Sequence, residues 1–144
     1  KLDTQKNLYG NFYIEPNGVF LLDLDNKGAI LTQENFKKIN KSNIKYATQS
    51  GPIVLEEGKI NSYFNEKSIN FNIRSGVGKI IGSNTIVFII SKTPVTFFNF
   101  SSVFKKLGCN NALYLDGAIS EFYLPQLGLI DTKNRFGPII GLIN

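Results

Sequence analysis

Short apolar runs separated by turn residues predict that strands dominate this chain. The runs are rich in β-branched and aromatic residues, and Gly, Pro, Asn or Asp stand between them. This pattern is typical of strands joined by tight turns. The strands expected in the first half are 11–15, 19–23, 29–31, 46–48 and 53–55. The later ones are a hairpin of 71–81 with 85–91, then 112–115, 121–124 and 139–143.

Two segments have the periodicity of amphipathic helices instead. Residues 32–40 begin with Thr32, a favourable N-cap, and place Phe36 on an apolar face. Residues 97–107 repeat aromatic and aliphatic side chains at helical spacing, and Gly108 is expected to end that helix. With strands in the majority and hairpin connections between them, the sequence predicts an α+β fold. We expect a largely antiparallel or mixed β-sheet with two or three short helices.

Composition narrows the class of protein. A chain of 144 residues suits one domain with its own core, so we expect a single domain over residues 1–144. A hydrophobic content of 42% with 19% charged residues argues against disorder. No apolar run approaches the roughly 20 residues that span a bilayer. The net charge of +5 permits an anionic partner, but the lysines are scattered. We expect no nucleic-acid partner and no membrane span; the oligomeric state stays open.

The residue types that are missing restrict the chemistry further. Without His, the chain has no Ser-His-Asp or Cys-His apparatus and no His-ligated zinc site. Its single cysteine, Cys109, cannot form an internal disulfide and is expected to be a small buried residue. Residues 23–34 imitate a calcium loop, but Lys27 stands where an oxygen ligand belongs, so we expect a surface hairpin turn. We therefore expect no metal and no cofactor, with calcium as an alternative for a longer form of the protein.

Three segments place polar side chains and glycine together where an apolar run begins or ends. They are Gln49-Ser50-Gly51-Pro52, Arg74-Ser75-Gly76, and Asp116-Gly117 with Ser120. A carboxylate at the end of a buried strand often holds charge at the rim of a sheet. An ordinary turn is the alternative for Asp116-Gly117, because Asp-Gly is a frequent turn pair. For Arg74, a guanidinium in a solvent-filled cleft and an ordinary surface arginine are equally compatible with the sequence.

Taken in order, residues 46–52, 74–78 and 111–117 with Ser120 resemble the phosphodiester glycosidase family, whose bacterial members also resemble residues 10–20. Members of this family remove a sugar such as N-acetylglucosamine from a phosphodiester. Many bacterial relatives are exported, so the resemblance implies a periplasmic or extracellular location. Family members usually carry a further segment rich in Asn, Gly and Phe upstream of position 1. The resemblance therefore implies that this chain is part of a longer protein.

The resemblance also implies which residues form the site. Asp116 and Arg74 are the implied catalytic residues. The implied substrate-binding residues are Gln49, Ser50, Gly51, Ser75, Gly76, Gly117 and Ser120. Arg74 would stabilise charge on the phosphate, while Asp116 would stabilise an oxocarbenium-like centre, act as nucleophile or activate water. The implied protein is a hydrolase acting on a glycan or glycosyl phosphate. The alternative is a non-catalytic carbohydrate- or envelope-binding domain on the same fold.

Overall fold

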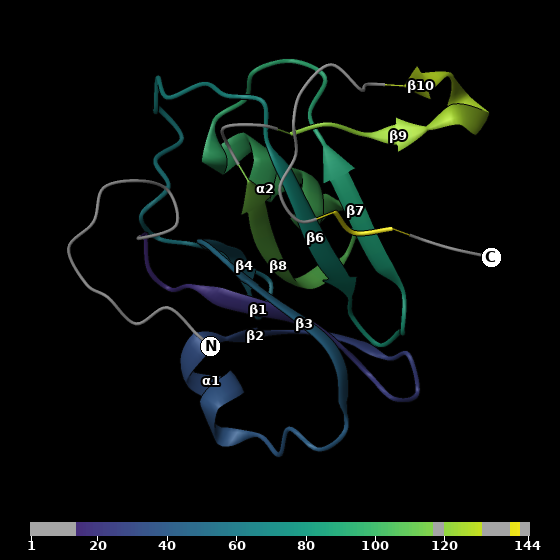
Figure 1. Ribbon diagram of the computed structural model, residues 1–144. Coiled ribbons are helices and arrows are strands. Elements are labelled where there is room, and N and C mark those ends of the chain that lie inside the picture. The colour runs from purple at the N-terminus through teal and green to yellow at the C-terminus, as the bar shows by residue number, and fades with distance from the viewer. Residues whose placement is uncertain (1–13, 117–119, 131–138, 142–144) are drawn as a thin grey trace.

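Two antiparallel sheets packed face to face form the centre of the molecule (Figure 1). The structure is a computed structural model that describes residues 14–116, 120–130 and 139–141. The first sheet has the strand order β2-β1-β3, and the second has the order β5-β4-β8-β6-β7. The first consists of β1 (Gly18–Asp23), β2 (Gly28–Thr32) and β3 (Ile44–Ser50). The second consists of β4 (Ile53–Glu56), β5 (Lys59–Ile60), β6 (Ser75–Ile80), β7 (Ile86–Ile90) and β8 (Cys109–Asp116).

Two α-helices cover the outer faces of the sheets. The helix α1 (Gln33–Lys38) begins after Thr32, whose hydroxyl accepts a hydrogen bond from the Asn35 N–H as an N-cap should. The helix α2 (Phe97–Lys106) begins after Thr96, which caps it in the same way. The polypeptide leaves α2 through a glycine in the left-handed region, Gly108 at φ +79°. A short ribbon of β9 (Tyr123–Leu124), the 3₁₀ turn η2 (Pro125–Leu127) and β10 (Leu129–Ile130) follows β8.

Alternation along β1 shows how these layers are stacked. Val19 and Leu21 pack with Phe36 of α1, whereas Phe20 packs with Val77 of β6 in the second sheet. The other face of the second sheet carries a larger core with α2, which includes the buried side chains Phe97, Phe100, Phe104 and Tyr114. The order of layers is therefore α1, first sheet, second sheet, α2. Burying a side chain such as Phe104 stabilises the fold by roughly 1.5–3 kcal/mol.

Glycines in β6 let α2 approach the sheet closely. A Cβ on Gly76 would lie 2.8 Å from the Leu113 carbonyl oxygen, and one on Gly78 would lie 2.6 Å from Cδ1 of Phe104. Both distances are shorter than a van der Waals contact, so a side chain at either position would push α2 or β8 away. The close approach places the first turn of α2 beside the start of β6.

The predicted α+β class is confirmed, as are the two helices, the Thr32 cap and the hairpin that became β6 and β7. The Asp23 carboxylate accepts a hydrogen bond from the Lys27 N–H, so residues 23–28 form the expected hairpin turn between β1 and β2. None of the described helices is long and apolar enough to cross a membrane.

Two strand predictions are wrong within the described residues. Residues 14–15 lie in a bend, and both edges of β1 are already paired, with β2 and with β3. A strand at 11–15 would therefore find no free edge of β1 with which to pair. Residues 139–141 are not in a strand either. Residues 11–13 and 142–143, the rest of these two predictions, lie outside the described residues. Of the predicted 121–124 strand, only the last two residues pair, as β9.

Candidate functional site

The ends of three strands bring several of the predicted site segments together. β3 ends at Ser50, β6 begins at Ser75, and these two strands meet the C-terminal end of β8, where Ser75 lies opposite Asp116. The buried Ser50 hydroxyl donates a hydrogen bond to the Leu115 carbonyl oxygen at 2.8 Å. This bond ties the first sheet to the end of β8. Segments that are 25 or more residues apart in the sequence therefore meet where β8 ends and β6 begins in the second sheet.

Two serine hydroxyls meet at this edge. The Ser120 Oγ donates a hydrogen bond to the Ser75 Oγ at 3.0 Å, and both side chains are half-buried. The register shifts between Ser75 and Gly76, so that β8 has one extra residue there. Such bulges often lie beside active sites because they redirect side chains at the end of a strand. We call Ser50, Ser75, Ser120 and the end of β8 at Asp116 the strand-end cluster.

The other predicted site residues have different surroundings. Gln49 is half-buried in β3, opposite Val19 of β1. Gly51 is buried in the connection that leads from the first sheet to the second. Gly76 lies under α2, where close packing explains the glycine. The Asp116 side chain and Gly117 lie outside the described residues, so their predicted roles stay predictions.

Arg74 is completely buried, which contradicts both interpretations of it as a solvent-facing side chain. Its Nε donates to the Val95 carbonyl oxygen at 2.9 Å, and its Nη2 donates to the Asn70 carbonyl oxygen at 3.1 Å. The guanidinium carbon lies 3.6 Å from the centre of the Phe97 ring and 5.6 Å from that of Tyr114. Arg74 thus connects the loop before β6 to the segment that enters α2. The sequence did not reveal this because its partners are backbone carbonyls and core aromatics.

The charge of Arg74 is held without an acidic partner among the side chains that the structure describes. Burial lowers the pKa of the guanidinium from its ordinary value, and the neighbouring Tyr114 acts in the opposite direction. The aromatic faces beside the guanidinium offset part of the cost of removing it from water. Side chains alternate along a strand, so Arg74 faces α2 while Ser75 faces the other side. The Arg74 guanidinium and the Ser75 side chain therefore lie on opposite faces of the second sheet.

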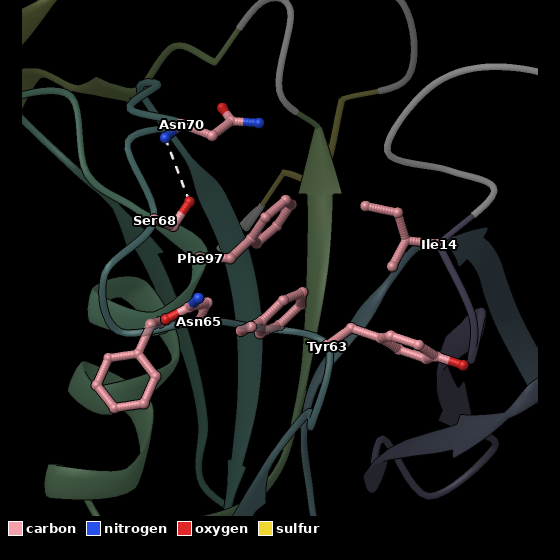
Figure 2. Close-up of a pocket in the computed structure, with 8 residues that line it drawn as sticks. Ile14, Tyr63, Asn65, Ser68, Asn70 and Phe97 are labelled. Atoms are coloured by element: carbon pink, nitrogen blue, oxygen red, sulfur yellow. Dashed lines mark hydrogen bonds between the residues drawn. The ribbon is translucent and has the colours of Figure 1, made fainter.

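A cleft of about 190 Å³ lies on the α2 side, between the loop of residues 61–70 and the start of the helix (Figure 2). The residues that line it are Ile14, Tyr63, Phe64, Asn65, Ser68, Asn70, Phe97 and Phe98. Arg74 contacts two of them, Asn70 and Phe97, from behind. We call this cavity the loop cleft. The sequence offers one signal for this cleft, the aromatic residues that stand among the Asn and Ser side chains of residues 61–70.

A model of the phosphodiester glycosidase family matches residues 3–135. The chain belongs to this family. It is also 39% identical over 116 residues to the Escherichia coli protein YigE, which is described as uncharacterized. This match covers 80% of the chain and 44% of YigE, so the chain spans less than half the length of that relative.

The fold is also similar to that of a solved structure. The catalytic domain of zebrafish N-acetylglucosamine-1-phosphodiester alpha-N-acetylglucosaminidase, auto-inhibited by its pro-peptide, superimposes with a TM-score of 0.51 and 17% sequence identity. The match covers 71% of this chain and 40% of that chain. At this level of identity the likeness shows the fold alone.

Proposed function

We propose that this protein hydrolyses a glycosyl phosphodiester, releasing a sugar of the N-acetylglucosamine type, and that the reaction takes place at the strand-end cluster. The observation that carries the proposal is the Ser75–Ser120 hydrogen bond at 3.0 Å, which gathers two of the three polar-glycine segments beside the end of β8. Membership of the phosphodiester glycosidase family supports this reaction class.

The chemistry suits a chain that has no histidine. The bond between sugar C1 and oxygen breaks, its electron pair leaves with a phosphate monoester, and water supplies the hydroxyl that C1 gains. A phosphate monoester has its remaining ionisation at a pKa of about 6, so it departs with little help from a general acid. The main requirement is a carboxylate near C1, which we assign to Asp116. Ser75, Ser120 and Gln49 would position sugar hydroxyls or phosphate oxygens.

Burial changes the role proposed for Arg74. Its guanidinium is completely buried on the α2 side of the sheet, where Nε and Nη2 donate to the carbonyl oxygens of Val95 and Asn70. We therefore propose that Arg74 positions the start of β6, and with it Ser75, rather than contacting the phosphate directly. Arg74→Lys should then lower kcat and the free energy of unfolding together. It should change KM by the same factor for substrates that differ in their phosphate groups.

The test is the hydrolysis of UDP-N-acetylglucosamine and of a simple N-acetylglucosamine 1-phosphodiester. Asp116→Asn is expected to reduce kcat about 10²–10⁴-fold, the usual contribution of a group that transfers a proton or stabilises the reacting centre. Asp25→Asn makes the same chemical change at an exposed turn and is expected to keep full activity. Full activity of Asp116→Asn would remove this residue from the mechanism. No turnover by the unaltered protein, together with saturable glycan binding, would favour the non-catalytic binding domain.

A further inference from the structure

The lining of the loop cleft combines aromatic rings with uncharged polar groups. Four of its eight residues are aromatic, three others carry an amide or an aliphatic hydroxyl, and none is charged. In Figure 2, the Phe97 ring lies between Asn70 and Ser68 on one side and Ile14 and Tyr63 on the other. The Phe97 ring is nearly buried, whereas 75% of the Tyr63 side chain is exposed at the rim.

This composition selects among chemical classes of ligand. An anion needs a cation or converging N–H groups, but no charged residue is among those that line the cleft. Arg74 lies behind Phe97 and Asn70, completely buried, and its Nε and Nη2 donate to backbone carbonyl oxygens. A purely apolar ligand would make no use of the side-chain amide nitrogens of Asn65 and Asn70, whose oxygens alone accept hydrogen bonds within the described residues. A neutral sugar ring meets both requirements, because its C–H faces stack on aromatic rings while its hydroxyls hydrogen-bond with amides. A cavity of about 190 Å³ has room for a single ring rather than a chain of them.

The loop that forms one wall is held in place before any ligand arrives. Its first residue, Asn61, donates from its side-chain amide to the Ile53 carbonyl oxygen at 2.9 Å. The Phe64 ring stacks on Phe97 with centroids 4.6 Å apart and an interplanar angle of 8°. Arg74 fixes the far end of the loop through Asn70. A wall ordered in advance lowers the entropy cost of binding.

Polar groups of this wall remain available to a ligand. The Asn65 side-chain oxygen accepts the Lys67 N–H at 2.8 Å, and the Ser68 hydroxyl accepts the Asn70 N–H at 3.2 Å. These bonds use one acceptor in each side chain. The Asn65 side-chain nitrogen donates no hydrogen bond within the described residues, and the Ser68 hydroxyl still has its own hydrogen to donate. The cleft can therefore donate hydrogen bonds to sugar hydroxyl oxygens.

We propose that the loop cleft is a subsite for one neutral sugar ring of the substrate, separate from the strand-end cluster where the bond is cleaved. The identity of the ligand as a sugar rests on the proposed function, while its neutrality rests on the lining itself. The cleft would give the protein a preference for substrates that carry a further uncharged sugar, without taking part in the chemistry.

A tryptophan reporter tests the site directly, because the natural chain has no Trp. In a Tyr63→Trp variant, titration with methyl N-acetylglucosaminide is expected to produce a saturable change in indole fluorescence. Tyr46→Trp is the matched control, since Tyr46 is 64% exposed on β3, away from the cleft, and its indole should not respond. Inorganic phosphate should leave both signals unchanged. A response to phosphate and not to the neutral sugar would overturn the proposal.

Isothermal titration calorimetry measures the affinity for the same sugar without a tryptophan reporter, in the unaltered protein and in variants. Tyr63→Ala and Asn65→Asp are expected to weaken binding of the same sugar at least 10-fold; the aspartate keeps the acceptor for the Lys67 N–H and loses the amide donor. Tyr46→Ala and Asn84→Asp make the same changes at exposed positions elsewhere and should bind as the natural protein does. Undiminished binding by Tyr63→Ala and by Asn65→Asp would contradict the subsite.

The two proposals can fail separately. Sugar binding that depends on Tyr63, in a protein without hydrolytic activity, would support the subsite and refute the proposed reaction. Hydrolysis that depends on Asp116, with no sugar bound at the cleft, would support the reaction and refute the subsite.

Discussion

Arg74 and Ser75 are consecutive residues of one motif, yet they belong to regions of opposite character. Arg74 lies on the α2 side, fully buried between Phe97 and backbone carbonyl oxygens. Ser75 lies at the start of β6, half-buried, where its hydroxyl meets that of Ser120. The comparison shows that a polar residue in a family motif can serve the stability of the fold as well as the chemistry. Substitutions on the α2 side should mainly change stability, and those in the strand-end cluster should mainly change activity.

Arg74→Ala should have the largest effect on stability. It removes the guanidinium and its hydrogen bonds to the Val95 and Asn70 carbonyl oxygens, and it opens a cavity beside Phe97. We expect the free energy of unfolding to fall by about 3–5 kcal/mol in urea denaturation. Lys79→Ala, at a half-exposed position in the same strand, should change it by less than about 0.5 kcal/mol. An unchanged unfolding energy with lost hydrolysis would instead make Arg74 a substrate contact.

Gly76→Ala should also act through stability, although this position was predicted to bind substrate. Its new Cβ would lie 2.8 Å from the Leu113 carbonyl oxygen, a backbone atom that cannot move without shifting β8. Overpacking of this kind costs about 1–3 kcal/mol, which thermal or urea denaturation can measure. Gly141→Ala, where no atom lies within 4 Å, is the control and should be close to neutral. If Gly76→Ala has normal stability and loses sugar turnover, then Gly76 belongs to the strand-end cluster.

Ser75→Ala and Ser120→Ala should show the reverse pattern. Each removes one partner of a half-buried hydrogen bond, which is worth about 1 kcal/mol or less. A double-mutant cycle should find that the two effects are not additive, because both changes break the same bond. The same variants should lower kcat/KM for the phosphodiester, whereas Ser83→Ala in the turn between β6 and β7 should not. Additive stability effects with normal kcat/KM would contradict the cluster.

Replacing Cys109 should have the smallest effect on stability, and the pH dependence of that effect tests whether water reaches the core between α2 and the second sheet. Burial raises the pKa of this thiol, which is 4% exposed. Below the unfolded-state pKa of about 8.5 both states keep the proton, so the thiol adds no pH dependence there. As the pH rises above that value, the unfolded chain loses the proton first and stability falls. The stability difference between the natural protein and Cys109→Ala should therefore shrink above about pH 8.5. A constant difference across that range would mean that water reaches the thiol.

Much of the fold could be predicted from local patterns. Thr32 and Gly108 mark helix ends through hydrogen bonds and backbone angles that involve only their neighbours, and both predictions are confirmed. The hairpin of β6 and β7 was also predicted, because a turn and its two flanking runs are contiguous in the sequence. The strand expected at 11–15 failed at its described end, since nothing local to it reveals that both edges of β1 are taken.

The candidate site was predictable only in part. The motif around Ser75 and the one that ends with Ser120 were identified from sequence, and the structure brings them into contact. The loop cleft was missed because its walls come from residues 61–70, from the start of α2 and from Ile14, which are far apart in the chain. No periodicity or spacing within one of these segments indicates that they meet.

The sequence by itself determined the α+β class, the main helices and hairpins, and the family to which the chain belongs, because these depend on short-range patterns and on ordered motifs. Only the tertiary structure decided that Arg74 is buried, that Gly76 packs against β8 beneath α2, and that an uncharged cleft lies between residues 61–70 and the start of α2. Burial and close packing depend on which distant segments come together, and in a layered fold neighbouring residues of one strand point into different layers.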